Sequence, residues 1–384
     1  MGTWLRSWKQ SRLSLAIIAV YAFLGMFNAI VANDQPLLAK TQVSWVFPAF
    51  QDLLFDWGLA DHEALTNQEQ PFQTAIYPPI RYKAGTLDAQ YASFLSPLQG
   101  IAGGHYLGTD QLGRDVAAGV VRGCYTSFRI GLLATLLCAI LGVSLGLFMG
   151  YFGNNGIQVN LLQCVFIGVW LFFSIYFMVY PPHLGGWLLL FAILFWLATL
   201  IAILILLQRA GKTNIGFPLD ALLNRIIALR RSIPTLILLL VLFPLFAKPE
   251  VNNVILVILI LGWTSFARHA RAETLSVKER EYVTAARIMG SGHLAILYRH
   301  ILPNILPTLL LLGAMNFAGN VLLESTLSFL GMGLPPEEVS WGSLLSEGRK
   351  NPYAWWLVVF PGFVLFVLVF TINQLTDQYL EKDA

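Results

Sequence analysis

The chain has 384 residues, of which 57% are hydrophobic and only 12% are charged, whereas a soluble domain carries about 25% charged residues. The apolar residues form runs long enough to cross a bilayer, which takes roughly 20 residues per helix. This composition excludes a soluble globular protein and predicts an all-α polytopic membrane protein. The formal net charge of +3 decides little by itself, and we expect no nucleic acid among the partners of the chain.

The first predicted span, Leu13–Ala32, follows a basic stretch that contains Arg6, Lys9 and Arg12. The run is longer than the roughly 7–15 residues of a signal-peptide core, and no small-x-small cleavage site follows it. Basic residues beside a span favour the cytoplasmic side of the membrane. Residues 1–32 are therefore predicted to form a cytoplasmic end and a retained first transmembrane helix.

A polar, aromatic-rich segment, residues 33–122, is predicted to form an extracytoplasmic cap. It holds nine acidic and five basic side chains, which is consistent with the outer side of the membrane. The cap ends in the sequence LGTDQLGRD at residues 107–115. There, Thr109 or Asp110 is predicted to cap a helix that runs on through Val116–Arg122.

The second predicted span, Phe128–Tyr151, lies in a segment that covers residues 123–156. Gly142, Gly146 and Gly150 occur in this span at a spacing of four, which places them on one helix face. Glycines on one face let two backbones approach closely, so we predict helix packing there. Ordinary glycine usage in membrane helices is the alternative interpretation.

Two further apolar runs, Leu161–Tyr180 and Trp187–Leu207, are joined by a turn of six residues without Lys or Arg. They predict a transmembrane hairpin, residues 157–216, whose turn faces the outside. The following stretch, Gln208–Ser232, is rich in basic residues and has a single acidic residue, Asp220, so it is placed on the cytoplasmic side. Its apolar residues predict a short helix that leads into the next span.

The remaining segment, residues 217–376, is predicted to hold four more spans, a charged cytoplasmic loop at 268–303 and an outer loop at 324–353. The four spans are predicted at Ile233–Phe246, Val254–Phe266, Ile305–Leu323 and Ala354–Asn373. A short cytoplasmic tail, residues 377–384, completes the chain. The total is eight transmembrane helices with both termini in the cytoplasm, which agrees with the basic N-terminal end and the two basic loops.

The charged loop carries six basic and three acidic side chains between residues 268 and 300, so it cannot lie in hydrocarbon. Within it, Ala285, Ala286 and Gly290 are small and lie roughly one helical turn apart. Small side chains let a helix sit close in the cleft of a partner. We therefore predict that another protein pushes on the chain at this loop. A solvated connector with ordinary charges is the alternative.

No pattern for catalysis, nucleotide binding or metal binding is found in the sequence. Gly211-Lys212-Thr213 resembles the end of a phosphate-binding loop, but Leu206 occupies the position of the required first glycine. The three cysteines, Cys124, Cys138 and Cys164, lie in or beside apolar runs and predict packing roles. We expect no catalytic residue, metal or cofactor in this chain. A proton- or sodium-coupled carrier usually keeps charged groups near the midplane, but these apolar runs are almost free of them, which indicates that energy enters through a partner.

Three segments resemble elements of a known family. Residues 107–115 resemble its LGTDxLGRD element, and residues 325–342 resemble its TLSFLGxG…PPxxxWG outer loop. Residues 281–290, with Ile-Leu-Pro-Asn at 301–304, resemble its EAA loop. The family is that of the permease subunits of bacterial ATP-binding-cassette importers, and the resemblance is greatest to the C-type permeases of dipeptide and oligopeptide systems.

This resemblance implies roles for particular residues. The residues that would couple to the ATPase are Glu281, Thr284, Ala285, Ala286, Gly290 and Pro303. The outer-face motifs contribute Gly108, Thr109, Asp110, Gly113, Arg114, Asp115, Phe329, Gly331, Trp341 and Gly342. Thr284 departs from the pattern, because the family has glutamate there. Residues 157–216 resemble an insertion into a type I importer core of six transmembrane helices.

The resemblance also implies a function. The chain would be the non-catalytic, membrane-spanning subunit of an ATP-driven importer of peptides or related small solutes in the inner membrane. Its implied partners are a second related permease, two ATPase subunits that bind ATP and Mg, an extracytoplasmic solute-binding protein and membrane lipid. Other cargo, namely nickel, glutathione, an opine or a peptide antibiotic, stays open. A stand-alone secondary carrier or channel is an alternative of a different class, against which the nearly uncharged spans argue.

Overall fold

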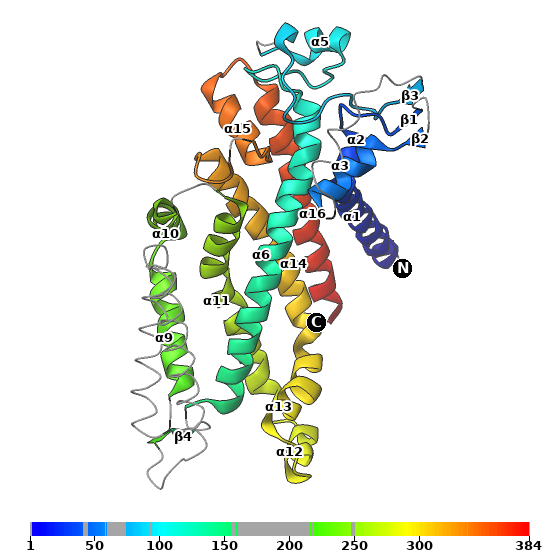
Figure 1. The fold of residues 1–384 in the computed structure, drawn as a ribbon. Coiled ribbons are helices and arrows are strands. Elements are labelled where there is room, and N and C mark those ends of the chain that lie inside the picture. Colours follow the sequence, from blue (N-terminus) through cyan, green and yellow to red (C-terminus); the bar gives the residue numbers. More distant parts are fainter. Residues whose placement is uncertain are drawn as a thin grey trace. The chain divides into compact units, whose positions relative to one another are not determined.

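The computed structural model describes residues 2–40, 45–57, 59, 74–91, 94–154, 158–159, 215–216, 218–246, 250–335 and 337–383 (Figure 1). The predicted runs Leu161–Tyr180 and Trp187–Leu207, together with Cys164 and Gly211-Lys212-Thr213, lie outside the described residues. The chain divides into two compact units. The first unit comprises Met1–Gly142, Ile233–Phe266 and Leu306–Ala384, and the second unit comprises Val143–Ser232 and Ala267–Ile305.

Four helices in the described part of the chain are long and apolar enough to cross a membrane. They contain α6 (Val116–Phe152), α11 (Val251–Val277), α14 (Leu302–Phe329) and α16 (Trp356–Asp383). The predicted all-α polytopic class is thereby confirmed. The total of eight spans stays a prediction, because the hairpin segment lies outside the described residues.

Helix α6 begins earlier than the span predicted within it. It confirms the predicted helix over Val116–Arg122, but the predicted cap at Thr109 or Asp110 is wrong. Asp115 caps the helix instead, because its Oδ1 accepts a hydrogen bond from the backbone N–H of Ala118 at 2.7 Å. Because no proline interrupts the sequence from the cap to the end of the apolar run, the helix continues without a break.

The predicted first span, Leu13–Ala32, is divided in the structure. Helix α1 (Gly2–Met26) is followed by a separate short helix, α2 (Asn28–Val31). The apolar part of α1, Arg12–Met26, is shorter than the roughly 20 residues that cross a bilayer. This part packs along α16 within the first unit.

The predicted span Ile233–Phe246 is not a single helix. Pro234 precedes α10 (Thr235–Leu242), and a 3₁₀ turn, η4 (Phe243–Leu245), follows it. Proline donates no backbone hydrogen bond and disfavours a helical residue before it, so Pro234 and the proline inside η4 limit α10 to a length below that of a span. Upstream, α9 (Leu219–Ser232) confirms the short helix that the sequence predicted.

The charged loop predicted at 268–303 is largely helical. Helix α11 continues through Val277, so the first charged residues of the predicted loop belong to this helix. Helices α12 (Glu281–Ile288) and α13 (His293–Ala295) follow, and then the π-helix η5 (Ile296–Ile301) runs into α14. The wider turn of η5 accommodates Pro303, which cannot donate to the carbonyl four residues earlier.

The outer loop predicted at 324–353 is also mostly helical. Helix α14 ends only at Phe329, and α15 (Trp341–Lys350) begins soon afterwards. A capping box starts α15: the Ser340 Oγ accepts from the backbone N–H of Ser343 at 3.3 Å, and the Ser343 Oγ accepts from that of Ser340 at 2.9 Å. The prediction failed because it ended the span where polar residues begin, although the helical hydrogen bonds continue.

The segment predicted as a cap contains short strands and helices. Its antiparallel sheet has the order β2 (Trp45–Val46), β1 (Leu38–Lys40), β3 (Thr74–Ile76). Ala39 of β1 lies opposite Val46 on one side and Ala75 on the other. The described part of this segment also contains the short helices α3 (Pro48–Asp56), η1 (Ala89–Tyr91), α5 (Pro97–Gly100) and η2 (Ile101–Gly103).

Two further strands flank the predicted inserted hairpin. Strands β4 (Gln158–Val159) and β5 (Ile215–Gly216) pair antiparallel, with Gln158 opposite Gly216. Residues at the two ends of the predicted insertion therefore lie side by side in the second unit. This closure supports our proposal that residues 157–216 form an insertion that can be removed from a simpler core.

The core of the first unit packs α6 against α10, α11 and α14. Ile130, Val257 and Leu327 are buried together in this core. Cys124 and Cys138 are buried, as expected for packing residues. Apolar contacts between helices therefore hold the elements that carry the polar sites described below.

The glycine face of α6 meets α11 within the second unit. A Cβ atom added to Gly146 would lie 2.7 Å from the Cβ of Ala270, and one added to Gly150 would lie 2.6 Å from the Cβ of Thr274. The Lys278 Nζ also donates to the Gly150 carbonyl at 3.0 Å. We propose that this face, including Gly142 one turn earlier, lets the two backbones approach closely.

Replacing Gly146 with Val is expected to destabilise the protein by about 1–3 kcal/mol, because the added side chain overpacks the contact with α11. The matched control is Gly313→Val in α14, where an added Cβ meets no atom within 4 Å. Thermal unfolding in detergent measures both variants. A melting temperature of Gly146→Val equal to that of the control would contradict close packing at this face.

Candidate functional site

The sequence 107–115 forms a tight turn before α6 in the first unit. Gly108 and Gly113 have positive φ angles of 83° and 79°, which favour glycine. The Asp110 Oδ1 accepts hydrogen bonds from the backbone N–H groups of Leu112 and Arg114, each at 2.9 Å, and its Oδ2 accepts one from the Arg114 Nε at 2.6 Å. The Thr109 Oγ1 accepts one from the backbone of residue 95 at 2.9 Å. These predicted site residues therefore fix the shape of the turn.

Asp115 is buried at the end of this turn and connects the cap segment to α6. Besides capping the helix, its Oδ2 lies 2.9 Å from the Nδ1 of the buried His105. Burial raises the pKa of Asp115, although the hydrogen bonds from Ala118 and His105 oppose this shift. The ring of Tyr82 stacks on His105 with 4.1 Å between ring centroids.

Replacing Asp115 with Ala is expected to destabilise the protein by about 2–4 kcal/mol. The helix cap accounts for about 1 kcal/mol of this, and the loss of the partner of the buried His105 Nδ1 for about 1–3 kcal/mol. Glu347→Ala is the control, since Glu347 pairs with the exposed Lys350 and such pairs contribute at most about 1 kcal/mol. If thermal unfolding gives the same stability for the two variants, Asp115 does not hold the cap to α6.

Two tryptophans connect the outer-loop motif (residues 325–342) and α16 with the turn and α6. The Trp341 Nε1 donates to the carbonyl of Val120 at 3.0 Å, and the Trp356 Nε1 donates to that of Thr109 at 3.0 Å. Trp341 is completely buried and lies over Gly123, where an added Cβ would be 2.5 Å from its Nε1. The two outer-face motifs that were predicted separately are therefore brought together in one place.

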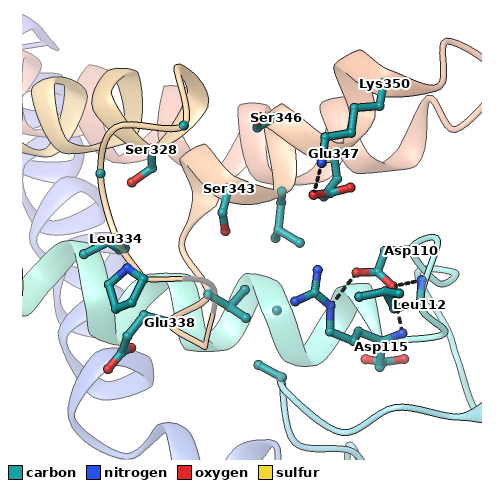
Figure 2. A pocket seen from close by; sticks show the side chains of 18 residues that line it. Asp110, Leu112, Asp115, Ser328, Leu334, Glu338, Ser343, Ser346, Glu347 and Lys350 are labelled. Carbon is teal, nitrogen blue, oxygen red and sulfur yellow. Dashed lines mark hydrogen bonds and ion pairs between the residues drawn. The ribbon is translucent and has the colours of Figure 1, made fainter. Parts of the chain in front are cut away.

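The two outer-face motifs and α15 line a pocket of about 390 Å³ that carries both charged and apolar side chains (Figure 2). Arg114 pairs with Asp110 on the wall formed by the turn, and Lys350 pairs with Glu347 at 2.7 Å on the wall formed by α15. Glu338 also lines the pocket. Walls with charges of both signs suit a polar ligand or a polar segment of a partner.

The remaining outer-face residues shape the chain around this pocket. Gly331 has a φ angle of 74°, so the backbone can turn sharply after α14. An added Cβ on Gly342 would lie 2.7 Å from the Cβ of Ser328. Phe329 packs under the guanidinium of Arg349, with 5.0 Å between that group and the ring centroid.

Glu324 is a buried polar residue that the sequence reasoning placed in an outer loop. It lies inside α14 and is fully buried. Its carboxylate accepts hydrogen bonds from the hydroxyls of Ser127 at 3.0 Å, Ser328 at 2.9 Å and Ser325 at 3.3 Å. Ser328, one helical turn after Glu324, was the only local sign in the sequence that this glutamate is hydrogen-bonded inside a helix. Its partner Ser127 on α6 is too distant in sequence to be recognised in this way.

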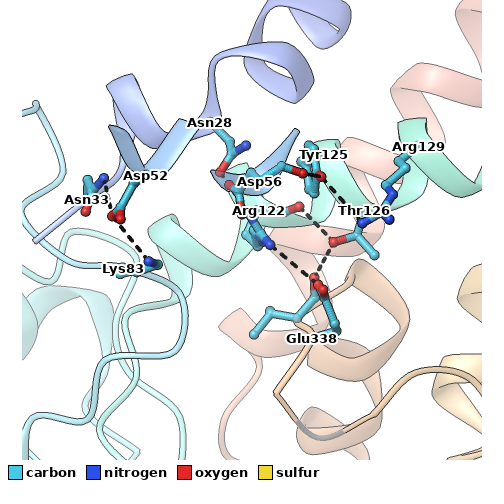
Figure 3. A network of polar contacts seen from close by, with 11 residues as sticks. Asn28, Asn33, Asp52, Asp56, Lys83, Arg122, Tyr125, Thr126, Arg129 and Glu338 are labelled. Carbon is cyan, nitrogen blue, oxygen red and sulfur yellow. Dashed lines mark hydrogen bonds and ion pairs between the residues drawn. The ribbon is translucent and has the colours of Figure 1, made fainter. Parts of the chain in front are cut away.

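Arg122 was likewise not predicted as a site residue. It lies near the start of α6 and forms an ion pair with Asp56 at 2.5 Å and with Glu338 at 3.6 Å (Figure 3). Its Nη1 also donates to the Oδ1 of Asn28 at 3.2 Å. This network joins the cap segment, α6 and the loop before α15, all within the first unit.

In the second unit, α12 presents one face to its own chain and leaves the other exposed. Val283 and Ala286 are buried, whereas Ala285 is exposed and Ile288 and Met289 are 82% and 78% exposed. Of the two alanines predicted to meet a partner, Ala286 thus faces inward. Large apolar side chains so exposed at a helix end are typical of an interaction surface.

The C-terminal end of α12 has a defined geometry. Gly290 has a φ angle of 81°, and its N–H donates to the carbonyl of Arg287 at 3.0 Å. The next N–H, of Ser291, donates to the carbonyl of Ala286 at 3.1 Å. Gly290 therefore stops the helix and fixes where Ile288 and Met289 project. The predicted site residues Glu281 and Thr284 are exposed on α12, and Pro303 lies in the first turn of α14.

Polar contacts hold the surroundings of α12 within the second unit. The guanidinium of Arg271 on α11 forms a bidentate pair with the carboxylate of Asp220 on α9. The Arg287 guanidinium lies 5.8 Å from the centroid of the Tyr151 ring, and the Tyr151 hydroxyl lies 2.9 Å from the Nδ1 of His293. These contacts attach α12 and the residues after it to the end of α6, and they join α9 to α11.

Apolar spanning helices, a pocket lined by ion pairs and a short exposed helix indicate a membrane protein with surfaces for partners. Within the described ranges, no group of three or more His, Cys, Asp or Glu side chains could hold a metal ion. Comparison with known proteins identifies the family. Residues 205–382 match the model of a family described as "binding-protein-dependent transport system inner membrane component".

Three relatives span most of the chain. A peptide transport system permease of Brucella suis is 30% identical over 274 residues, which cover 71% of each chain. The oligopeptide transport system permease OppC of Mycobacterium tuberculosis is 27% identical over 306 residues, 79% of this chain and 81% of the relative. The peptidoglycan transport system permease YejE of Agrobacterium fabrum is 26% identical over 385 aligned residues, 93% of this chain and 84% of the relative. The chain therefore belongs to this family of multi-pass inner-membrane permeases.

Proposed function

We propose that this permease imports peptides or related small solutes as part of an ATP-binding-cassette transporter and forms half of the translocation pathway. The relatives support this cargo class, because their names refer to peptide, oligopeptide, dipeptide and peptidoglycan transport. Nickel, glutathione, opines and peptide antibiotics are the alternative cargo.

The proposed assembly contains a second related permease, two ATPase subunits and an extracytoplasmic solute-binding protein. The ATPase subunits would bind ATP and Mg, and this chain would itself catalyse no reaction. Both termini and the loop at 268–303 would lie in the cytoplasm, and the cap at 33–122 would lie outside. This orientation is supported by the positions of the basic residues along the sequence.

The exposed tip of α12 is the observation that carries the proposal. A short helix that anchors Val283 and Ala286 on one face and projects Ile288 and Met289 from its end can insert apolar side chains into a partner's cleft. Buried apolar anchors dominate the energy of such contacts. Closure of two ATPase subunits on ATP would then move α12 together with the helices on either side of it, α11 and α14.

The pocket at the outer-face motifs is proposed as the contact for the solute-binding protein. Its paired charges, Arg114 with Asp110 and Lys350 with Glu347, line walls from two different elements. A partner with complementary charges can orient on such a surface before it releases its cargo. The cap and the segment before α15 would form the rest of this contact.

Transport in reconstituted vesicles tests the proposed function. Vesicles that contain both permeases and both ATPase subunits should take up labelled peptide only when ATP is inside and the binding protein is outside. Vesicles with the permease alone should take up nothing when an ion gradient is imposed. Gradient-driven uptake by the permease alone would support a secondary carrier and contradict the proposal. Competition by unlabelled peptide, nickel or glutathione then identifies the cargo.

A further inference from the structure

An open groove of about 700 Å³ lies on the first unit, where the cap segment meets the first turns of α6. Met26 of α1, Phe55 of α3 and Trp57 form part of its wall. Phe128 and Leu132 of α6 continue the groove along the spanning helix. Glu338 lines both this groove and the pocket at the outer-face motifs, whereas the other residues of the groove lie outside the motifs discussed above.

The apolar part of the groove leads onto a surface suited to hydrocarbon. Leu132, Leu133, Leu136, Leu137 and Ile140 are all exposed on α6, one to three turns further along the helix. Exposed leucines and isoleucines on a spanning helix face lipid chains or another subunit. Trp57 at the other end of the groove, itself exposed, is of the residue type that gathers at the membrane–water interface.

The polar part of the groove carries two separate charges. Asp56 and Glu338 both pair with Arg122, so two carboxylates share one guanidinium and this cluster has a net negative charge (Figure 3). Arg129 is exposed, and its Nη1 lies 3.5 Å from the phenolic oxygen of Tyr125. Among the residues that the structure describes, no carboxylate lies within ion-pair distance of Arg129.

We propose that the groove binds phosphatidylethanolamine, a zwitterionic phospholipid with a primary ammonium group. The lipid phosphate pairs with Arg129, its ammonium group lies toward the partly exposed Glu338, and its acyl chains follow Phe128 and Leu132. Arginine matches phosphate oxygens with a planar fork of donors. The proposal rests on the groove and on insertion in a membrane, and it is independent of the transported cargo.

The same charges discriminate among phospholipids. The headgroup of phosphatidylglycerol is anionic and has no cationic group to place against the negative cluster at Asp56 and Glu338. Phosphatidylcholine has a positive charge but no N–H donor for the Glu338 carboxylate. The groove should therefore prefer phosphatidylethanolamine to both, since only this lipid offers a phosphate, a positive charge and a hydrogen-bond donor.

Native mass spectrometry of the assembled transporter, supplied with equal amounts of the three phospholipids, tests the proposal. The unmodified protein should retain phosphatidylethanolamine in preference to the other two. Arg129→Gln should lower the occupancy of all three lipids by about tenfold, the usual effect of losing one charged hydrogen bond. Glu338→Gln should remove the preference and retain lipid binding. Arg81→Gln, an exposed arginine of the cap outside the groove, is the control.

Several results would overturn the proposal. If the unmodified protein retains the three lipids equally, the proposed preference for phosphatidylethanolamine is wrong. Unchanged occupancy in a folded Arg129→Gln protein would show that lipid binds elsewhere. Exclusion of all lipid from the groove by the second permease in the assembled transporter would identify this face as a contact between subunits.

Discussion

Replacing Ile288 and Met289 together with Asp is expected to lower ATP-driven uptake by more than about tenfold while the permease still inserts and folds. Both side chains are largely exposed in the chain alone, so the change removes little internal packing. In the assembled transporter it would bury two unpaired charges in an apolar cleft, which is far more costly than the loss of two apolar contacts. Uptake of labelled peptide into vesicles measures the effect.

The control is Ile76→Asp, which places one such charge at a 61% exposed isoleucine of β3 in the cap. It should leave uptake unchanged. A second comparison separates coupling from folding: Ala286→Asp puts a charge on the buried face of α12, so it should lower the amount of folded permease. Normal uptake by the Ile288 and Met289 double variant would contradict a role for this tip in energy transfer.

Replacing Trp341 with Ala is expected to destabilise the permease by about 3–5 kcal/mol, the largest stability effect that we predict. The indole is completely buried, donates to the carbonyl of Val120 and fills the space over Gly123. Its loss would leave a cavity beside α6 and remove the hydrogen bond from the indole to the Val120 carbonyl. The melting temperature and the yield of folded protein in detergent measure the change.

Trp355→Ala is the control for this prediction, because Trp355 is 51% exposed and lies next to the start of α16. This variant removes an indole of the same size without opening a buried cavity. It should change the stability by much less than Trp341→Ala. Equal losses in the two variants would show that the contact between α15 and α6 contributes little to the fold.

Much of the fold could be predicted from hydropathy, because a helix that crosses the hydrocarbon of a membrane needs a run of roughly 20 apolar residues. The class of protein, the cores of the long spans and the short helix α9 were predicted in this way. Helix ends could not be predicted, since hydropathy marks where hydrocarbon contact ends and says nothing of where backbone hydrogen bonds end. Residues 268–277 of α11 and residues 324–329 of α14 are examples. They include polar side chains and were predicted as loops, but they continue the helices.

The sites were predictable only as motifs. The sequence grouped Ala285 and Ala286 as one small surface, but it could not tell which side of α12 packs on its own chain. It ignored Ile288 and Met289, since apolar residues there gave no sign of exposure. Glu324 was misplaced because its partner Ser127 is far away in sequence. Pairings between distant segments decide these positions.

Cysteine cross-linking at the tip of α12 tests the central proposal most directly. In a chain whose three native cysteines are replaced with alanine, Met289→Cys should form a disulfide with a cysteine placed in the cleft of the ATPase subunit. The yield should change between the ATP-bound and nucleotide-free transporter, whereas Ile76→Cys should form no such bond. Absence of a cross-link from Met289→Cys in an active transporter, in every nucleotide state, would contradict coupling through α12.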